Sequence, residues 1–188
     1  MIGDGMADLI EAGVVTNTRK PFDRGLTVAG ALFGTGKLNH FAHRNPALLM
    51  CPPSHTHALP VLARIPHFIA INSALEVDLT GQVNAEVADG TYVGAVGGQA
   101  DFVRGALAAP HGRAIIALPA TARRGSASRI VTKLTGPVTS PRSDADVVVT
   151  EWGVAELRGA TLAERARRMI AVAAPDFREA LAREAAGG

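Results

Sequence analysis

The 188-residue sequence predicts an open α/β fold, with a mostly parallel sheet, flanking helices and an antiparallel hairpin. Three observations support this prediction. Short apolar runs have the length of buried strands, segments of helical period separate them, and two amphipathic helices end the chain. The length suits one domain, or one domain with a small appendage, and we expect a single domain over residues 1–188.

In the first half of the chain we expect two helices and five strands. Residues 5–12 place Met6, Leu9 and Ile10 on one face before Gly13 ends the helix, and a second helix covers residues 37–43. The expected strands are the apolar runs 26–33, 47–51, 68–71, 75–79 and 83–87. Thr80 and Gly81 join the last two runs, which is a hairpin signal.

In the second half, a glycine-rich loop at residues 94–98 precedes a helix over residues 99–108. Strands are expected at residues 114–118, 129–134 and 147–150, the last of which is the final clear strand. Thr161 and Glu164 then have capping-box spacing, which predicts the start of a helix. Pro175 suits the first turn of the next helix.

The composition excludes several classes of function. Hydrophobic residues make up 47% of the chain and charged residues 19%, which supports an ordinary core and argues against disorder. A net charge of +2, without a basic cluster, predicts no nucleic-acid partner. No apolar run reaches the roughly 18 residues of a membrane span, and acidic residues near the start argue against a signal peptide. The single Cys51 fits a reducing compartment, so we expect a cytoplasmic protein.

Two ligand-binding motifs are incomplete in this sequence. Residues 31–38 resemble a phosphate loop, but Ala31 occupies the first glycine position and Leu38 the final Ser/Thr position, so we predict a turn before a helix. Cys51, His55 and His57 lie close together, but no fourth ligand follows at a recognisable spacing. We therefore predict no metal site.

Three positions carry possible chemistry, each with a structural alternative that the residues alone leave open. The loop at 94–98 before a helix is suited to bind an anion, or is simply a tight turn. Asn72 ends an apolar strand, where α/β sheets place their sites, although asparagine is also common in turns. Arg123 and Arg124 follow another strand and suit a phosphate, or are solvated loop charges.

Residues 146–159, which read DVVVTEWGVAELRG, resemble the VVTE(Y/H)GVA-LRG segment of the acetyl-CoA hydrolase/transferase family. This family includes 4-hydroxybutyrate and acetate CoA-transferases. Five further segments resemble its C-terminal domain in the same order, at residues 4–17, 71–84, 97–106, 117–129 and 174–178. The resemblance covers nearly the whole chain.

The resemblance implies a ping-pong reaction in which a glutamate takes CoA from an acyl-CoA and passes it to a small carboxylate. It places the oxyanion hole at the Asn72 amide and the Gly98 N–H. It also implies contacts to CoA at Gly94, Gly97, Gly98 and Arg123. CoA is then a substrate, and no tightly bound cofactor is expected.

The sequence departs from the family pattern at three places. Ala95 replaces the first glycine of the usual G-x-G-G loop, and Trp152 replaces a tyrosine or histidine. Met1 matches the Met of an approximate H-T-E-M motif, so the catalytic glutamate and the N-terminal CoA-transferase domain are expected to lie outside these residues. Glu76 and Glu151 are expected to be internal ion-pair partners rather than substitutes for that glutamate.

The leading hypothesis is therefore the C-terminal half of a CoA-transferase or acyl-CoA hydrolase, inactive by itself. The alternative is a non-catalytic CoA-binding module or partner subunit. A domain separated from its partner exposes an apolar face, so self-association into a homo-oligomer is also expected. The acyl donor, the acceptor and the choice between transfer and hydrolysis stay open.

Overall fold

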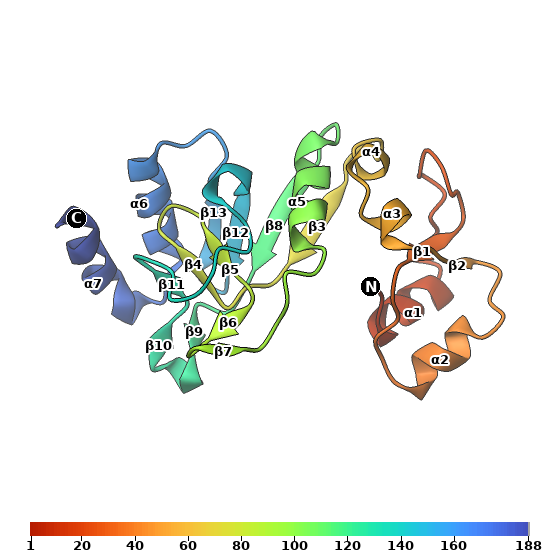
Figure 1. Ribbon diagram of the computed structural model, residues 1–188, viewed down its shortest axis with the longest axis horizontal. Helices are drawn as coiled ribbons and strands as arrows, with labels where there is room; N and C mark the ends of the chain where they lie inside the picture. Colours follow the sequence, from red (N-terminus) through yellow and green to blue (C-terminus); the bar gives the residue numbers. More distant parts are fainter. Residues whose placement is uncertain (188) are drawn as a thin grey trace.

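The computed structural model describes residues 1–187 and has the predicted α/β architecture. Figure 1 shows two parts along the long axis: the first helices and strands lie at one end, and the sheets with the remaining helices form the larger body. No helix in this described range combines the length and hydrophobicity needed to cross a membrane.

The central sheet has four strands in the order β13-β12-β8-β3. Strands β3 (Ile69–Asn72), β8 (Arg113–Ala117) and β12 (Val147–Thr150) are parallel, which confirms the mostly parallel sheet. Strand β13 (Gly153–Glu156) pairs antiparallel with β12. The sequence prediction that residues 147–150 were the final clear strand was wrong, because β13 is short and half polar and its signal is weak.

The predicted hairpin is present in a second sheet, of order β11-β4-β5. Strands β4 (Glu76–Asp78) and β5 (Val83–Asn84) are antiparallel, and Gly81 takes the left-handed φ of +95° that the turn needs. The Asp78 carboxylate accepts hydrogen bonds from Thr80 N and Gln82 N, both at 2.9 Å. The strand predicted at 129–134 is shorter, since β11 (Ile130–Val131) alone pairs with β4.

Helices α5 (Gln99–Ala108) and α6 (Leu162–Val172) pack on the side of the central sheet that carries Ala70, Ala114 and Val148. The main core joins both sheets to α6 and to α7 (Pro175–Ala186). The capping box is confirmed: Thr161 Oγ1 accepts from Glu164 N at 3.3 Å, and Glu164 Oε2 accepts from Thr161 N at 2.7 Å. The hydrogen bonds that Thr161 N and Thr161 Oγ1 donate to the Glu164 carboxylate lower the pKa of this carboxyl.

The N-terminal part contains four helices and a small parallel sheet, namely α1 (Asp4–Glu11), β1 (Thr27–Ala29), α2 (Gly36–Ala42), β2 (Leu48–Met50), α3 (Pro53–Thr56) and α4 (Leu59–Leu62). The strand predicted at 26–33 is only β1, because the chain then turns away to pair Leu32 with Ile2. The turn predicted at 31–38 is confirmed. Thr35 caps α2 by accepting a hydrogen bond from Lys37 N, and the Asp4 carboxylate accepts from Leu38 N.

The core around α6 supports a direct stability prediction. Met169 is completely buried in the main core, whereas Leu162 on the same helix is 54% exposed. We expect Met169→Ala to lower the free energy of unfolding by about 2–5 kcal/mol, and Leu162→Ala by much less. Urea denaturation of the two variants measures this difference, and equal losses would contradict the packing described.

Candidate functional site

Two residues singled out by the sequence, Asn72 and Gly98, lie toward the carboxyl ends of the parallel strands. Strand β3 ends at Asn72, and β8 leads toward Arg123. The C-terminal end of α5 lies where β3 and β8 begin, since His67 N donates to Pro110 O at 2.8 Å and Arg113 N donates to Phe68 O at 3.0 Å. Helix α5 therefore runs antiparallel to these two strands. Gly98, the N-cap residue of α5, therefore lies at the same end of the parallel strands as Asn72.

Asn72 has an unusual environment. Its Nδ2 atom is buried and has no hydrogen-bond partner within residues 1–187. Leaving a buried amide donor unsatisfied costs about 1–3 kcal/mol, so folded proteins rarely retain one without a use. The arrangement suits a side chain that donates to an oxygen of a bound ligand.

The three predicted glycines have different surroundings. Gly94 N donates to Glu86 O at 3.1 Å, and a side chain there would collide with the Ala85 carbonyl, so Gly94 has a structural role. Gly97 takes a left-handed φ of +52°. Gly98 lies against the imidazole ring of His57, which leaves no room for a Cβ.

The loop leads directly into the first turn of α5. The first N–H groups of α5 have no intrahelical partner and carry the positive end of the helix dipole. Ala95 is not among the residues with positive φ, so the departure from glycine costs no backbone strain at this position. The loop and the Asn72 amide together are suited to hold an anionic oxygen.

Arg123 lies in a 3-10 helix (Arg123–Gly125) and forms an exposed ion pair with Asp89. The hydrogen bond from Arg123 to Asp89 and the carboxylate charge raise the pKa of this arginine. Asp89 sits in the turn between β6 (Val87–Ala88) and β7 (Thr91–Tyr92). The Asp89-Gly90 pair is a strong hairpin signal that our sequence analysis did not use. Exposed ion pairs of this kind contribute little to stability.

The expectation that Glu76 and Glu151 form ion pairs was wrong. The buried Glu76 carboxylate instead accepts hydrogen bonds from Thr135 N at 2.7 Å and Asn84 Nδ2 at 3.0 Å. Glu151 Oε2 accepts from Ala120 N at 2.8 Å, which ties the loop after β8 to the end of β12. Within the described chain, neither carboxylate has a cationic partner.

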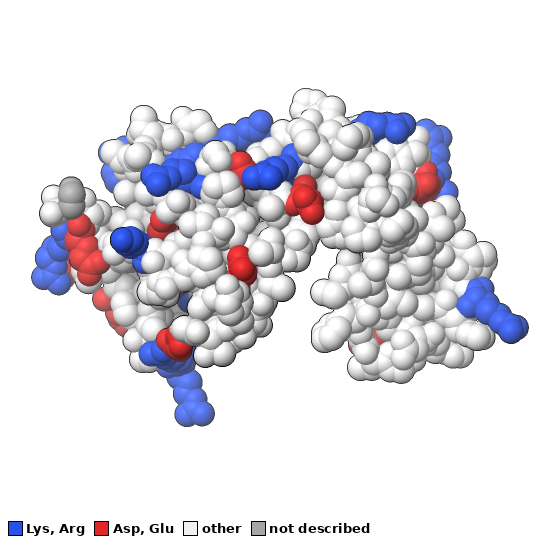
Figure 2. Space-filling view, viewed as in Figure 1, with Lys and Arg blue, Asp and Glu red and all other residues white. Residues whose placement is uncertain are grey.

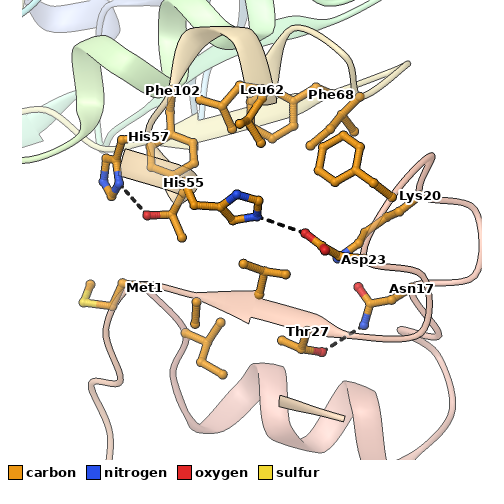
Figure 3. Close-up of a pocket in the computed structure, with 18 of the residues that line it drawn as sticks. Met1, Asn17, Lys20, Asp23, Thr27, His55, His57, Leu62, Phe68 and Phe102 are labelled. Atoms are coloured by element: carbon orange, nitrogen blue, oxygen red, sulfur yellow. Dashed lines mark hydrogen bonds and ion pairs between the residues drawn. The ribbon is translucent and has the colours of Figure 1, made fainter. Parts of the chain in front are cut away.

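A cavity of about 290 Å³ lies beside the glycine loop, where the N-terminal part meets α4 and α5. Figure 3 shows Met1 and His57 at one end of this cavity and Lys20 and Asp23 at the other. His57 lines the cavity, as Met1 does, and its ring also lies against Gly98. In the space-filling view of Figure 2 the molecule is notched between its two parts, and the visible walls are mostly uncharged.

The histidines near Cys51 are engaged separately. His55 Nε2 pairs with Asp23 Oδ2 at 3.0 Å, and His57 Nδ1 shares a hydrogen bond with Thr56 Oγ1 at 2.7 Å. Within residues 1–187 no three His, Cys, Asp or Glu side chains gather as metal ligands would. The sequence singled out His57 only as one of three clustered ligand types, because its contact with Gly98 is formed by tertiary packing.

The contact between His57 and Gly98 supports a second stability prediction. We expect Gly98→Ala to cost about 1–3 kcal/mol of folding free energy, because the new methyl group overlaps the imidazole ring. In a His57→Ala background the same change has room, so its cost is expected to fall. A double-mutant cycle by urea denaturation measures this coupling, and additive effects would show that the ring does not lie against Gly98.

Comparisons with known proteins identify the family. The family model described as the acetyl-CoA hydrolase/transferase C-terminal domain matches residues 34–185. The 4-hydroxybutyrate coenzyme A transferase of Clostridium kluyveri is 44% identical over 98% of this chain and 43% of that protein. The acetyl-CoA hydrolase of Saccharomyces cerevisiae is 32% identical over 95% of the chain and 31% of that protein.

A solved structure agrees with these sequence matches. RipA from Yersinia pestis superposes with a TM-score of 0.94 at 42% identity, over 99% of this chain and 42% of that one. The chain thus spans less than half the length of each of these relatives. With a family match over most of its residues and the same fold, this chain belongs to the acetyl-CoA hydrolase/transferase family, in the part that corresponds to the C-terminal domain.

Proposed function

We propose that this chain supplies the oxyanion hole and part of the CoA site of an enzyme that moves CoA between carboxylic acids. The observation that carries the proposal is the buried Nδ2 of Asn72, which has no hydrogen-bond partner within residues 1–187. Asn72 ends β3, and Gly98 is the N-cap of α5. One side-chain amide and one backbone N–H, both directed at a single oxygen, are what an acyl-transfer intermediate requires.

The reaction proceeds through a glutamate carboxylate. This carboxylate attacks the thioester carbonyl of the acyl-CoA, and the resulting oxyanion accepts hydrogen bonds from Asn72 Nδ2 and Gly98 N–H. CoA leaves as a thiolate and a mixed anhydride forms. The thiolate then attacks the glutamyl carbonyl, the carboxylic acid departs as its anion, and a glutamyl-CoA thioester remains. The acceptor carboxylate reverses these steps and takes the CoA.

The glutamate comes from a companion segment that is not among these 188 residues. Glu76 and Glu151 are both held by hydrogen bonds, which makes them poor candidates for the nucleophile. This chain covers 43% or less of the length of the two relatives, which therefore have enough further residues for such a segment.

An uncovered face of the central sheet gives the companion segment a place to dock. Parallel strands are normally covered on both faces, but the face opposite α5 exposes Ile69, Ile71 and Val154 by 46%, 68% and 62%. A face of this kind also favours self-association of the isolated chain into a homo-oligomer. The free Cys51 fits a reducing cytoplasmic environment.

Steady-state kinetics test the proposal. The 188 residues, expressed together with the companion half, are expected to show ping-pong exchange of CoA between an acyl-CoA and a free carboxylate. Borohydride should then reduce and trap the glutamyl-CoA thioester. Sequential kinetics without a trapped thioester would exclude the proposed mechanism. Release of free CoA in the absence of an acceptor measures how far water competes, and so separates hydrolysis from transfer.

A non-catalytic CoA-binding module is the second candidate, favoured by the hydrogen bonds that hold the carboxylates of Glu76 and Glu151. The N-terminus of α5 and Arg123 suit phosphate groups whether or not catalysis follows. Saturable CoA binding to the chain, combined with no turnover in the presence of the companion half, would select this candidate over the first.

A further inference from the structure

The glycine loop of residues 94–98 has few hydrogen bonds of its own. It belongs to the long connection from β7 to α5 in Figure 1, and residues 94–97 are exposed. Within residues 1–187, the backbone N–H groups of residues 95–98 donate no hydrogen bond to the protein. The orientation of the Gly98 N–H therefore depends on the contact with His57 and on how the two ends of the loop are held.

The first end of the loop is held by Glu86. The Glu86 carbonyl oxygen accepts hydrogen bonds from Val93 N at 2.9 Å and from Gly94 N at 3.1 Å. The Glu86 side chain is buried, and its Oε1 atom accepts from Thr139 Oγ1 at 2.8 Å. The same Thr139 oxygen accepts from Ala85 N at 2.9 Å, so this hydroxyl is both donor and acceptor. Thr139 therefore fixes the residue to which the loop is bonded.

The second end of the loop is held by Gln99, the first residue of α5. The Gln99 side chain is buried, and its Nε2 atom donates to Ser140 Oγ at 3.2 Å. Ser140 is buried as well and pairs with Val83 of β5: Val83 N donates to Ser140 O at 3.0 Å, and Ser140 N donates to Val83 O at 3.2 Å. The residue that follows Gly98 is thus tied to the second sheet.

Burial makes these hydrogen bonds hard to replace by water. The exposed fractions of Thr139, Ser140, Glu86 and Gln99 are 7%, 3%, 8% and 8%. A buried polar group that loses its partner stays unsatisfied, so the surrounding backbone moves to find another. Within residues 1–187 the Glu86 carboxylate forms no ion pair, and its orientation depends on the Thr139 hydroxyl.

Two adjacent residues therefore hold both ends of one exposed loop. We propose that Thr139 and Ser140 are positioning residues, which direct the Gly98 N–H at the reacting oxygen through Glu86 and Gln99. The inference rests on the proposed function, because it requires this N–H to be an oxyanion donor. Such a donor is effective only if it is already oriented when the charge develops, and a displacement of about 1 Å can lower a rate 10²-fold.

Removal of either hydroxyl tests the inference in the complete enzyme. Ser140→Ala and Thr139→Val are each expected to lower kcat by about tenfold to hundredfold. The KM for the acyl-CoA should change by less than about threefold, because the donor acts mainly in the transition state. Thr139→Ser retains the hydroxyl and should restore kcat. Ser143→Ala is the matched control, since Ser143 is an exposed serine of the same segment, bonded only to its neighbour Asp144 at 2.9 Å.

The order of the loop is measured separately, in the ¹⁵N-labelled 188-residue chain. We expect backbone order parameters of about 0.85 for Gly97 and Gly98, falling toward about 0.6 in Ser140→Ala and Thr139→Val. A purely structural role would lower the melting temperature and leave these order parameters unchanged. Circular dichroism checks the fold. If Thr139→Val does not fold, Ser140→Ala, which removes a single oxygen atom, is sufficient for the test.

A double-mutant cycle tests the link between Ser140 and Gln99. Gln99→Leu and Ser140→Ala remove the same hydrogen bond, so their effects on kcat should not add. Additive losses would contradict the proposed path from Ser140 to the loop.

Unchanged order parameters of Gly97 and Gly98, or an unchanged kcat, in both hydroxyl variants would overturn the inference. The proposed function fails separately. A loosened loop and a lower kcat in these variants, combined with full activity of Asn72→Ala, would refute the role of the Asn72 amide but not the positioning of the loop. The expected loss in Asn72→Ala, combined with normal kcat and loop order in the variants of Thr139 and Ser140, would refute the positioning role alone.

Discussion

The purified 188-residue chain is expected to transfer no CoA from an acyl-CoA to a carboxylate above the uncatalysed rate. An oxyanion hole stabilises a transition state that forms only when a nucleophile attacks, and Glu76 and Glu151 are held in hydrogen bonds. The measurement is exchange of labelled acetate into acetyl-CoA, with borohydride added to trap any glutamyl thioester.

The control for this experiment is the same chain supplied with the companion half, which should restore exchange. Loss of activity through misfolding is excluded if the isolated chain keeps its cooperative unfolding transition. Exchange by the isolated chain at a rate comparable to that of the complete enzyme would show that a nucleophile lies within residues 1–188 after all.

In the complete enzyme, Asn72→Ala is expected to lower kcat by roughly 10²–10³, which is the usual effect of removing one oxyanion donor. The KM for the acyl-CoA should change little, because the amide interacts most strongly with the charge that develops in the transition state. Ser73→Ala is the matched control, since Ser73 is the exposed neighbour of Asn72. A loss of less than tenfold in Asn72→Ala, or an equal loss in Ser73→Ala, would contradict the role given to the amide.

Elements with strong local signals were predicted well. Helix α5 has the predicted ends, and the capping box at Thr161 starts α6 where its hydrogen bonds require. The hairpin around Gly81 also follows from local turn chemistry. The errors fall where tertiary contacts determine the extent of a strand. The strand predicted at 26–33 is shorter because Leu32 pairs with Ile2. Strand β13 forms because its backbone pairs with β12 at the side of the sheet.

The candidate site was predictable in part. Asn72 could be singled out because a polar residue ends an apolar strand, and Gly98 because a glycine loop opens a helix. The unpartnered Nδ2 of Asn72 and the ring of His57 against Gly98 depend on packing that no sequence period records. The cavity was missed altogether, since its walls come from segments far apart in the sequence, near Met1, Asp23, His55 and Phe102.

The central claim is that Asn72 and Gly98 bind the same oxygen. A crystal structure of the complete enzyme with a bound CoA thioester tests it most directly, through the distances from Asn72 Nδ2 and Gly98 N to the thioester or glutamyl carbonyl oxygen. We predict that both distances lie at about 2.7–3.1 Å from one shared oxygen. Donors that point to different atoms, or an Asn72 amide bonded to another part of the protein, would contradict the proposed oxyanion hole.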